Sequence, residues 1–237
     1  MKIDYSIKYS ARKTISIIVE RDRSVVVRVP LNTSKELVET EINKRKFLLF
    51  QKINHPQKYT LPRDRKEFVS GEALLYFGKY YKLEVVDTIF DGVEFDSKFL
   101  ISKSNQKKAR QILKEWYVSQ AEQKIIPKVK QYAIHLGVKY KKISILDLKY
   151  RWGSCTPKDN INFNWRIIKA PGHVIDYIIV HELAHLIEGN HTPEFWNIVS
   201  IQLPHYNKAK EWLRENGNLL ETEFWRKGNR GVVNKNK

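Results

Sequence analysis

Runs of β-type residues surround one amphipathic helix in the first hundred residues of the chain. Residues 14–20 and 24–29 are rich in Ile and Val and flank a short polar segment, which is the pattern of a β-hairpin. A capping box at residues 33–36 then opens an apolar stripe that ends at His55 and Pro56, which predicts one helix. Three more short apolar runs predict strands, at residues 73–76, 80–87 and 92–101.

The hydrophobic period changes after residue 103. Apolar residues then recur every three to four positions, which predicts one long helix that Gly137 ends. Pro127 lies inside this pattern and should kink or interrupt the helix. Residues 143–150 and 161–165 predict two strands joined by a Pro-Lys-Asp-Asn turn. Strands first and helices later indicate an α+β protein.

This pattern divides the chain into three expected regions. Residues 1–103 form a β-rich N-terminal region with one helix, residues 104–228 form the region that carries the chemistry, and residues 229–237 form a tail that we expect to be disordered. Of the 237 residues, 42% are apolar and 29% are charged, so the composition is that of a globular protein.

The net charge of +17 comes mainly from two segments, residues 1–70 and 106–150. A basic surface of this kind attracts polyanions or nucleotides, but it also keeps a protein soluble, and both interpretations stay open. The most apolar stretch, residues 174–187, contains charged and imidazole side chains, so we expect no membrane segment. The single cysteine, Cys155, excludes an internal disulfide and is expected to be a buried thiol, and we expect a cytoplasmic protein.

Residues 181–185 read His-Glu-Leu-Ala-His and match the H-E-x-x-H motif inside a predicted helix. Four residues turn a helix by about 400°, so His181 and His185 leave the same face one turn apart. Two such imidazoles can bind zinc, and Glu182 beside them can take a proton from a water that the metal activates. The sequence therefore predicts one zinc ion per chain.

A hydrolytic zinc site needs a third ligand. His191 follows a predicted helix stop at Gly189 and Asn190, and Thr192 and Pro193 begin the next helix, so its ring can turn back toward the metal. A glutamate from the following helix is the other common solution, and the candidates are Glu194, Glu211 and Glu215. The metzincin pattern fits poorly, because position 188 is Glu rather than Gly and Met1 is the only methionine, so no Met-turn can follow.

Four segments together resemble the YgjP-like metallopeptidase family, relatives of the SprT and Spartan-type zinc proteases. They are Arg-Trp-Gly-Ser-Cys at 151–155, Asn-Trp-Arg at 164–166, the motif at 181–185, and Asn-His-Thr-Pro-Glu-Phe-Trp at 190–196. The resemblance implies a zincin-like catalytic core behind a β-rich front, with zinc on His181, His185 and His191 and with Glu182 as the catalytic acid and base. It leaves the substrate open, because some relatives are described as nucleoside-triphosphate pyrophosphatases and others degrade proteins crosslinked to DNA.

The segment before the motif is a candidate substrate site. Zincins hold the substrate backbone on an edge strand at this place, and glycine there would permit close approach of another chain. The candidate residues are Arg151, Trp152, Gly153 and Ser154. The alternative is a packed Trp152 beside a solvent-facing Arg151. Tyr177 could support His181 or pack in the core. The candidate donors to an oxyanion are His173, His205 and Tyr206.

Three functions remain to be separated. The first is a zinc metallopeptidase acting on a peptide or protein, with Glu182 as general base. The second is a nucleoside-triphosphate pyrophosphatase, which usually recruits Mg²⁺ through carboxylates that are sparse near the motif. The third is a nucleic-acid-associated processing or binding module that uses the basic surface, although no nucleic-acid fold signature is present. The tryptophans at helical apolar positions are expected in the core, namely Trp116, Trp196, Trp212 and Trp225.

Overall fold

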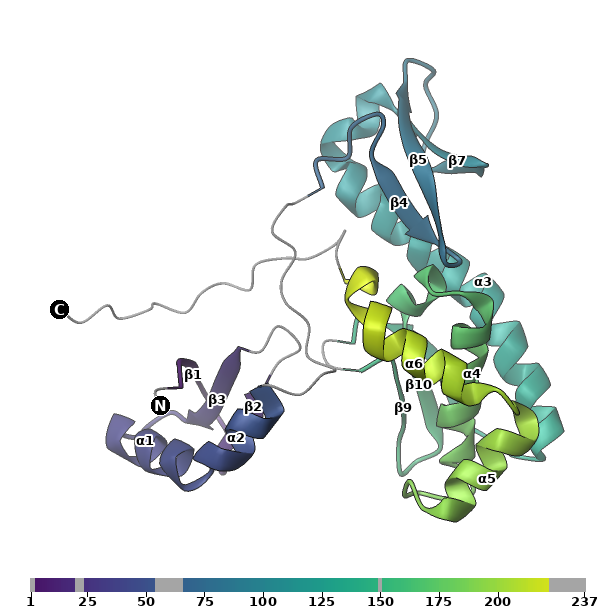
Figure 1. Ribbon diagram of the computed structural model, residues 1–237. Coiled ribbons are helices and arrows are strands. Elements are labelled where there is room, and N and C mark those ends of the chain that lie inside the picture. The colour runs from purple at the N-terminus through teal and green to yellow at the C-terminus, as the bar shows by residue number, and fades with distance from the viewer. Residues whose placement is uncertain (1–2, 20–23, 54–65, 149–150, 222–237) are drawn as a thin grey trace. The chain divides into compact units, whose positions relative to one another are not determined.

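The computed structural model describes residues 3–19, 24–53, 66–148 and 151–221 (Figure 1). These residues fall into two compact units, one within residues 1–63 and one within residues 64–224. Each unit combines helices with strands, so the fold is α+β, as the hydrophobic pattern indicated. Within the described residues, no helix is both long enough and apolar enough to cross a membrane.

The first unit contains a three-stranded sheet. Its strands are β1 (Tyr5–Ser10), β2 (Ser16–Val19) and β3 (Val25–Pro30). The central strand, β3, is parallel to β1 and antiparallel to β2. The antiparallel pair confirms the predicted hairpin for the residues that the structure describes.

Two helices cover this sheet, α1 (Lys35–Lys44) and α2 (Lys46–Ile53). Ser34 caps α1, because its hydroxyl accepts a hydrogen bond from the Leu37 N–H at 3.3 Å. The single helix predicted here is wrong, since the chain leaves helical geometry at Arg45 and restarts as α2. The predicted helix end at residues 55–56 lies outside the described residues. The small core joins strands and helices through Val19, Val25, Val27, Val29, Val38, Ile42 and Leu49.

The second unit begins with a four-stranded sheet in the order β4-β5-β7-β6. The strands are β4 (Ala73–Tyr76), β5 (Lys79–Val86), β6 (Glu94–Asp96) and β7 (Lys98–Ser102). The run predicted as one strand at 92–101 is therefore two strands, which meet at Ser97 in the left-handed region (φ 56°).

The longest helix, α3 (Ala109–Leu136), runs along the second unit beside this sheet and behind α4 (Gly172–Ala184), as Figure 1 shows. Gly137 ends α3 at φ 67°, as predicted. Pro127 does not interrupt the helix. Both Pro127 and Gln123, whose carbonyl loses its helical partner, are exposed, so water can bond that carbonyl.

The boundary expected at residue 103 does not coincide with the boundary between the two units. The four-stranded sheet shares its core with α3: the Phe99 and Trp116 ring centroids lie 5.0 Å apart, and the Tyr117 hydroxyl donates a hydrogen bond to the Leu75 carbonyl at 2.9 Å. Residues 66–102 therefore belong with the region that carries the motif. The expected tail at 229–237 lies outside the described residues.

A second, three-stranded sheet leads into the motif helix. Its strands are β8 (Lys142–Leu146), β9 (Gly153–Cys155) and β10 (Asn160–Asn164), in the order β8-β10-β9. Two of them correspond to the predicted strands, but β10 is parallel to β8 and antiparallel to β9. The Pro-Lys-Asp-Asn turn therefore joins β9 to β10, and the prediction that it joins the two longer strands is wrong. As a result, β9 is an edge strand.

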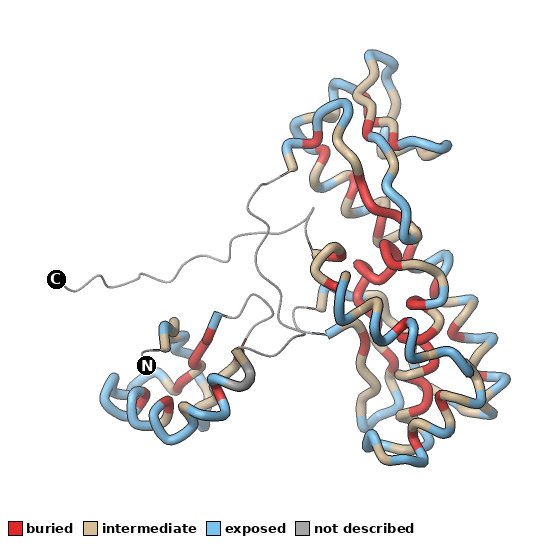
Figure 2. Tube along the Cα trace, in the orientation of Figure 1, coloured by how far each residue is buried: buried red, intermediate tan, exposed pale blue. Residues whose placement is uncertain are grey.

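The motif helix α4 lies in the centre of the second unit. Most of its residues are buried, and buried positions run along both α3 and α4 in Figure 2. Two helices follow it, α5 (Pro193–Gln202) and α6 (Tyr206–Asn216), and both contact α4. The strand β9 also contacts α4. The motif is thus held by a buried helix with an edge strand and two helices packed against it.

Candidate metal centre

Two imidazoles come from the last turn of α4. His181 lies within the helix and His185 is its C-terminal cap residue, so both leave the same face, and their ring centroids are 5.0 Å apart. His185 Nδ1 lies 3.2 Å from the Glu188 carbonyl oxygen. When Nδ1 carries the proton and donates this bond, the lone pair of Nε2 is free to bind a metal.

His191 reaches the same place from the segment between α4 and α5. Thr192 caps α5 by accepting a hydrogen bond from the Phe195 N–H at 3.3 Å, and Pro193 is the first residue of the helix. The turn brings His191 Nε2 to 3.1 Å from His181 Nε2. The ligand atoms of His181, His185 and His191 all lie within 4.8 Å of one another.

The spacing of two of the three histidines is that expected on a tetrahedral metal ion. Zinc binds imidazole nitrogen at about 2.0 to 2.1 Å, so two nitrogens on one tetrahedral ion lie roughly 3.3 Å apart. The separation of 3.1 Å between His181 and His191 is close to this value. Three imidazoles with no carboxylate favour zinc over Mg²⁺ or Ca²⁺, which prefer oxygen ligands.

The surroundings of His181 and His191 favour the unprotonated form of both rings. Burial lowers the pKa of His181 to about 3, with further lowering by the charges of His185, His191 and Lys210. Burial, His185 and Lys210 also lower the pKa of His191. A neutral imidazole offers the lone pair that a metal requires.

Glu182 lies about 100° around α4 from His181 and is buried against β9. Burial raises the pKa of its carboxyl to about 7, although a hydrogen bond from the Cys155 backbone N–H and the charge of Arg151 act in the other direction. A carboxyl with this pKa can both accept and release a proton near neutral pH.

Gly153 makes this packing possible. A Cβ atom at this position would lie 2.6 Å from Glu182 Cγ and 2.7 Å from Glu182 Oε1, closer than any real contact. The close approach expected at Gly153 is therefore made by the Glu182 side chain of the same chain. This contact could not be predicted from local sequence, since Gly153 and Glu182 are far apart along the chain.

The other residues of the candidate substrate segment take different positions. Arg151 is exposed, and Trp152 packs partly buried against the main core. Ser154 Oγ accepts a hydrogen bond from the Asn162 amide at 3.2 Å. Cys155 is half-buried rather than fully buried, and burial, Glu182 and Asp159 raise the pKa of its thiol, which disfavours a reactive thiolate. A substrate role for Arg151, Trp152, Gly153 and Ser154 stays a prediction.

The glutamates considered as third ligands do not join the histidines. Within the described part of the chain, the group of possible metal ligands consists of the three imidazoles. Glu194 is exposed, and Glu211 and Glu215 both pair with Arg214. Of the candidate oxyanion donors, His173 and His205 are exposed.

An aromatic stack next to the histidines was not foreseen. The Trp196 ring stacks on His191 with centroids 5.7 Å apart, and Tyr206 stacks on Trp196 at 5.4 Å. Tyr177 stacks on Tyr206 at 6.2 Å and lies 5.7 Å from His181. The expectation that Trp196 is a core residue is thus incomplete, because its ring contacts a candidate metal ligand. Helical periodicity alone could not distinguish these two roles.

Comparison with known proteins gives a family match and a match to a solved structure. The model of a family described as YgjP-like, metallopeptidase domain, matches residues 13–216 of the chain. Among solved structures, the crystal structure of the metallopeptidase zymogen of Pyrococcus abyssi abylysin matches with 22% sequence identity and a TM-score of 0.37, covering 43% of this chain and 99% of that chain. No curated protein matches the chain.

Proposed function

The chain belongs to the YgjP-like metallopeptidase family, and from this we propose that it is a zinc-dependent peptidase that cleaves a peptide or protein with Glu182 as general base. The observation that carries the proposal is the convergence of three imidazoles within 4.8 Å, beside a buried carboxyl whose pKa is about 7. His181, His185 and His191 would hold the ion. When bound, zinc supplies a Lewis acid that polarises a carbonyl group and acidifies water.

Glu182 performs the proton transfers. Its carboxylate accepts a proton from the attacking water and later passes it to the leaving amine nitrogen, so the same oxygen serves as base and then as acid. The Cys155 N–H holds the carboxylate by a hydrogen bond, and Gly153 leaves room for it. Burial of Glu182 raises its proton affinity, which matches the carboxyl to this role near neutral pH.

The edge strand β9 is an argument for a peptide as the substrate. Trp152 and Thr156 exchange backbone hydrogen bonds with β10, at 2.8 Å and 3.0 Å. Because backbone groups alternate along an antiparallel strand, those of Gly153 and Cys155 point to the other side, where the Cys155 N–H meets Glu182. An extended peptide on this side would lie next to the general base. This arrangement favours peptide over nucleotide as substrate.

The pyrophosphatase alternative has less support. Phosphoryl hydrolysis usually uses Mg²⁺ on carboxylates, and within the described residues the possible metal group contains imidazoles alone. Binding of a nucleotide, polyanion or nucleic acid to the basic segments stays a prediction, as does a cytoplasmic location.

The proposal is tested by zinc analysis and peptide hydrolysis of the wild type and Glu182→Gln. The amide keeps the size of the side chain but cannot accept the proton, so we expect about one zinc per chain in both proteins and a loss of at least about 10²-fold in kcat for the variant. Purified wild type that binds no zinc, or Glu182→Gln that hydrolyses peptides at the wild-type rate, would overturn the proposal.

A further inference from the structure

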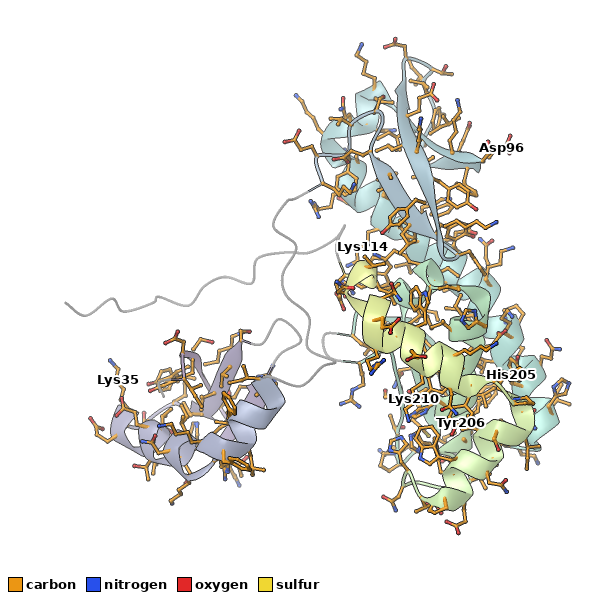
Figure 3. All side chains as sticks on the ribbon, viewed as in Figure 1. Lys35, Asp96, Lys114, His205, Tyr206 and Lys210 are labelled. Carbon is orange, nitrogen blue, oxygen red and sulfur yellow. The ribbon has the colours of Figure 1, made fainter. Side chains whose placement is uncertain are left out.

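A lysine from α6 lies next to the histidines. Lys210 Nζ is 4.3 Å from the centroid of the Trp196 ring, and Trp196 stacks on His191. Figure 3 labels Lys210 and Tyr206 on the side of α6 that faces α5. Because His191 Nε2 lies 3.1 Å from His181 Nε2, the contact with Trp196 places Lys210 beside the candidate metal centre.

The ammonium of Lys210 lies over an indole ring that other aromatic rings contact. Trp196 is held between His191 and Tyr206, with interplanar angles of 24° and 14°. A cation over the face of a fixed indole ring is attracted by the ring quadrupole. The Lys210 side chain is exposed, so an ammonium at this place is accessible to a ligand.

Lys210 has no anionic partner in the described part of the chain. The acidic residues nearest to it on α6, Glu211 and Glu215, are both paired with Arg214. A divalent ion held by the three histidines would be positively charged, and Lys210 adds another positive charge beside it. Two cations at one site repel each other unless an anion joins them. Glu182 is the acidic group of the motif, and it is buried on the β9 side of α4.

The geometry points to the substrate as the source of this anion: we infer that Lys210 binds a carboxylate of the peptide close to the bond that is cleaved, so that the enzyme prefers substrates with a carboxylate there. The inference rests on the proposed peptidase function. The carboxylate could be an Asp or Glu side chain or the free C-terminus of the peptide, and the two sources share the same chemistry. Lys210 is a specificity residue in this account, and it does not take part in proton transfer.

Three matched peptides test the inference after mass spectrometry has located the cleavage site. The first is neutral with an amidated C-terminus, the second has Glu in place of one Gln beside the scissile bond, and the third is neutral with a free C-terminal carboxylate. We expect a kcat/KM about fivefold higher for one carboxylate peptide than for the neutral peptide, the size of a partly exposed ion pair. The carboxylate peptide with the higher kcat/KM shows whether Lys210 binds a side-chain carboxylate or the C-terminal carboxylate. The preference should shrink as ionic strength rises.

The variants separate a substrate contact from other roles. Lys210→Gln should abolish the preference, so that the carboxylate and neutral peptides have equal kcat/KM values, and Lys210→Arg should keep the preference. Lys208→Gln is the matched control, because Lys208 is also exposed but lies about 200° around α6 from Lys210 and should retain the preference. A wild type without preference, or a Lys210→Gln variant that slows all three peptides equally, would overturn the inference.

Binding measurements separate this inference from the proposed function. Calorimetric titration of the peptides into Glu182→Gln, with and without Lys210→Gln, gives Kd without turnover. A Kd ratio of about fivefold that Lys210→Gln abolishes supports the carboxylate site even if no peptide is hydrolysed, in which case only the peptidase function fails. Equal Kd values for all peptides overturn the carboxylate site, whatever the hydrolysis assay shows.

Discussion

Replacement of Gly153 by alanine should disable Glu182 without removing the metal. The new Cβ would stand 2.6 Å from Glu182 Cγ and 2.7 Å from Glu182 Oε1. Carbon atoms pack at about 3.5 to 4.0 Å, so the two groups must separate by roughly 1 Å. Glu182 is buried and Gly153 is in a paired strand, so either the carboxylate swings away or β9 retreats from α4.

Both movements act on the proton transfer. A shift of about 1 Å in a catalytic group can cost about 10²-fold in rate, and we expect a loss of this size in kcat/KM. Overpacking at a buried position also costs about 1 to 3 kcal/mol of unfolding free energy. The three atoms nearest to the new Cβ all belong to Glu182 and none to a histidine, so the zinc content should stay that of wild type.

The assay combines hydrolysis of a labelled unfolded protein, zinc content and thermal unfolding. Gly172→Ala is the control, because Gly172 begins α4 and a Cβ there meets nothing within 4 Å. We expect this control to match wild type in activity. A Gly153→Ala protein with wild-type zinc and activity within about threefold of wild type would refute the argument that Gly153 positions Glu182. Loss of zinc from the variant would also refute it, since the effect would then pass through the ligands.

Two further predictions concern the third ligand and the acid stability of the fold. His191→Ala should weaken zinc binding by more than about 100-fold, as measured by competition with a chelator, whereas Glu194→Ala should leave it nearly unchanged; the opposite result would move the ligand to Glu194. Burial raises the pKa of Asp147, but hydrogen bonds and charges from Lys114 and Arg166 lower this pKa to about 2. A carboxyl whose pKa is lower in the folded state than in the unfolded chain, where it is about 3.9, stabilises the fold at higher pH and loses this effect as pH falls toward 2. The Tm difference between wild type and Asp147→Asn should therefore be largest above pH 5 and vanish near pH 2. A Tm difference that does not change with pH would contradict the assignment.

The helical part of the site could be predicted because it depends on local geometry. The four-residue spacing of His181 and His185 places both rings on one face of any helix. The cap at Thr192 and Pro193 fixes where α5 begins, and this leaves His191 in the turn before it. The stop at Gly137 is equally local, because glycine readily adopts the left-handed conformation there.

The strands were harder to predict because their pairing is not local. β9 has three residues, too few for a period of two to stand out, and its partner was identified only in the folded chain. The parallel pairing of β8 with β10 joins segments on either side of β9, which no turn signal encodes. The boundary expected at residue 103 differs from the boundary between the two units for a related reason. The hydrophobic pattern shows which residues are buried but not which element they pack against.

The chemistry of Glu182 depends both on the local geometry of the helix and on the non-local packing of β9. On an exposed helix the same motif would carry a glutamate with a pKa of about 4.3, too acidic to hold a proton at neutral pH. Burial against β9 raises the pKa of this carboxyl to about 7. The strand that buries Glu182 also supplies the Cys155 N–H that opposes the rise and the glycine that makes contact possible. The motif therefore determines which groups can react, and β9 sets the proton affinity of the base among them, so variants of β9 should alter kcat more than they alter zinc content.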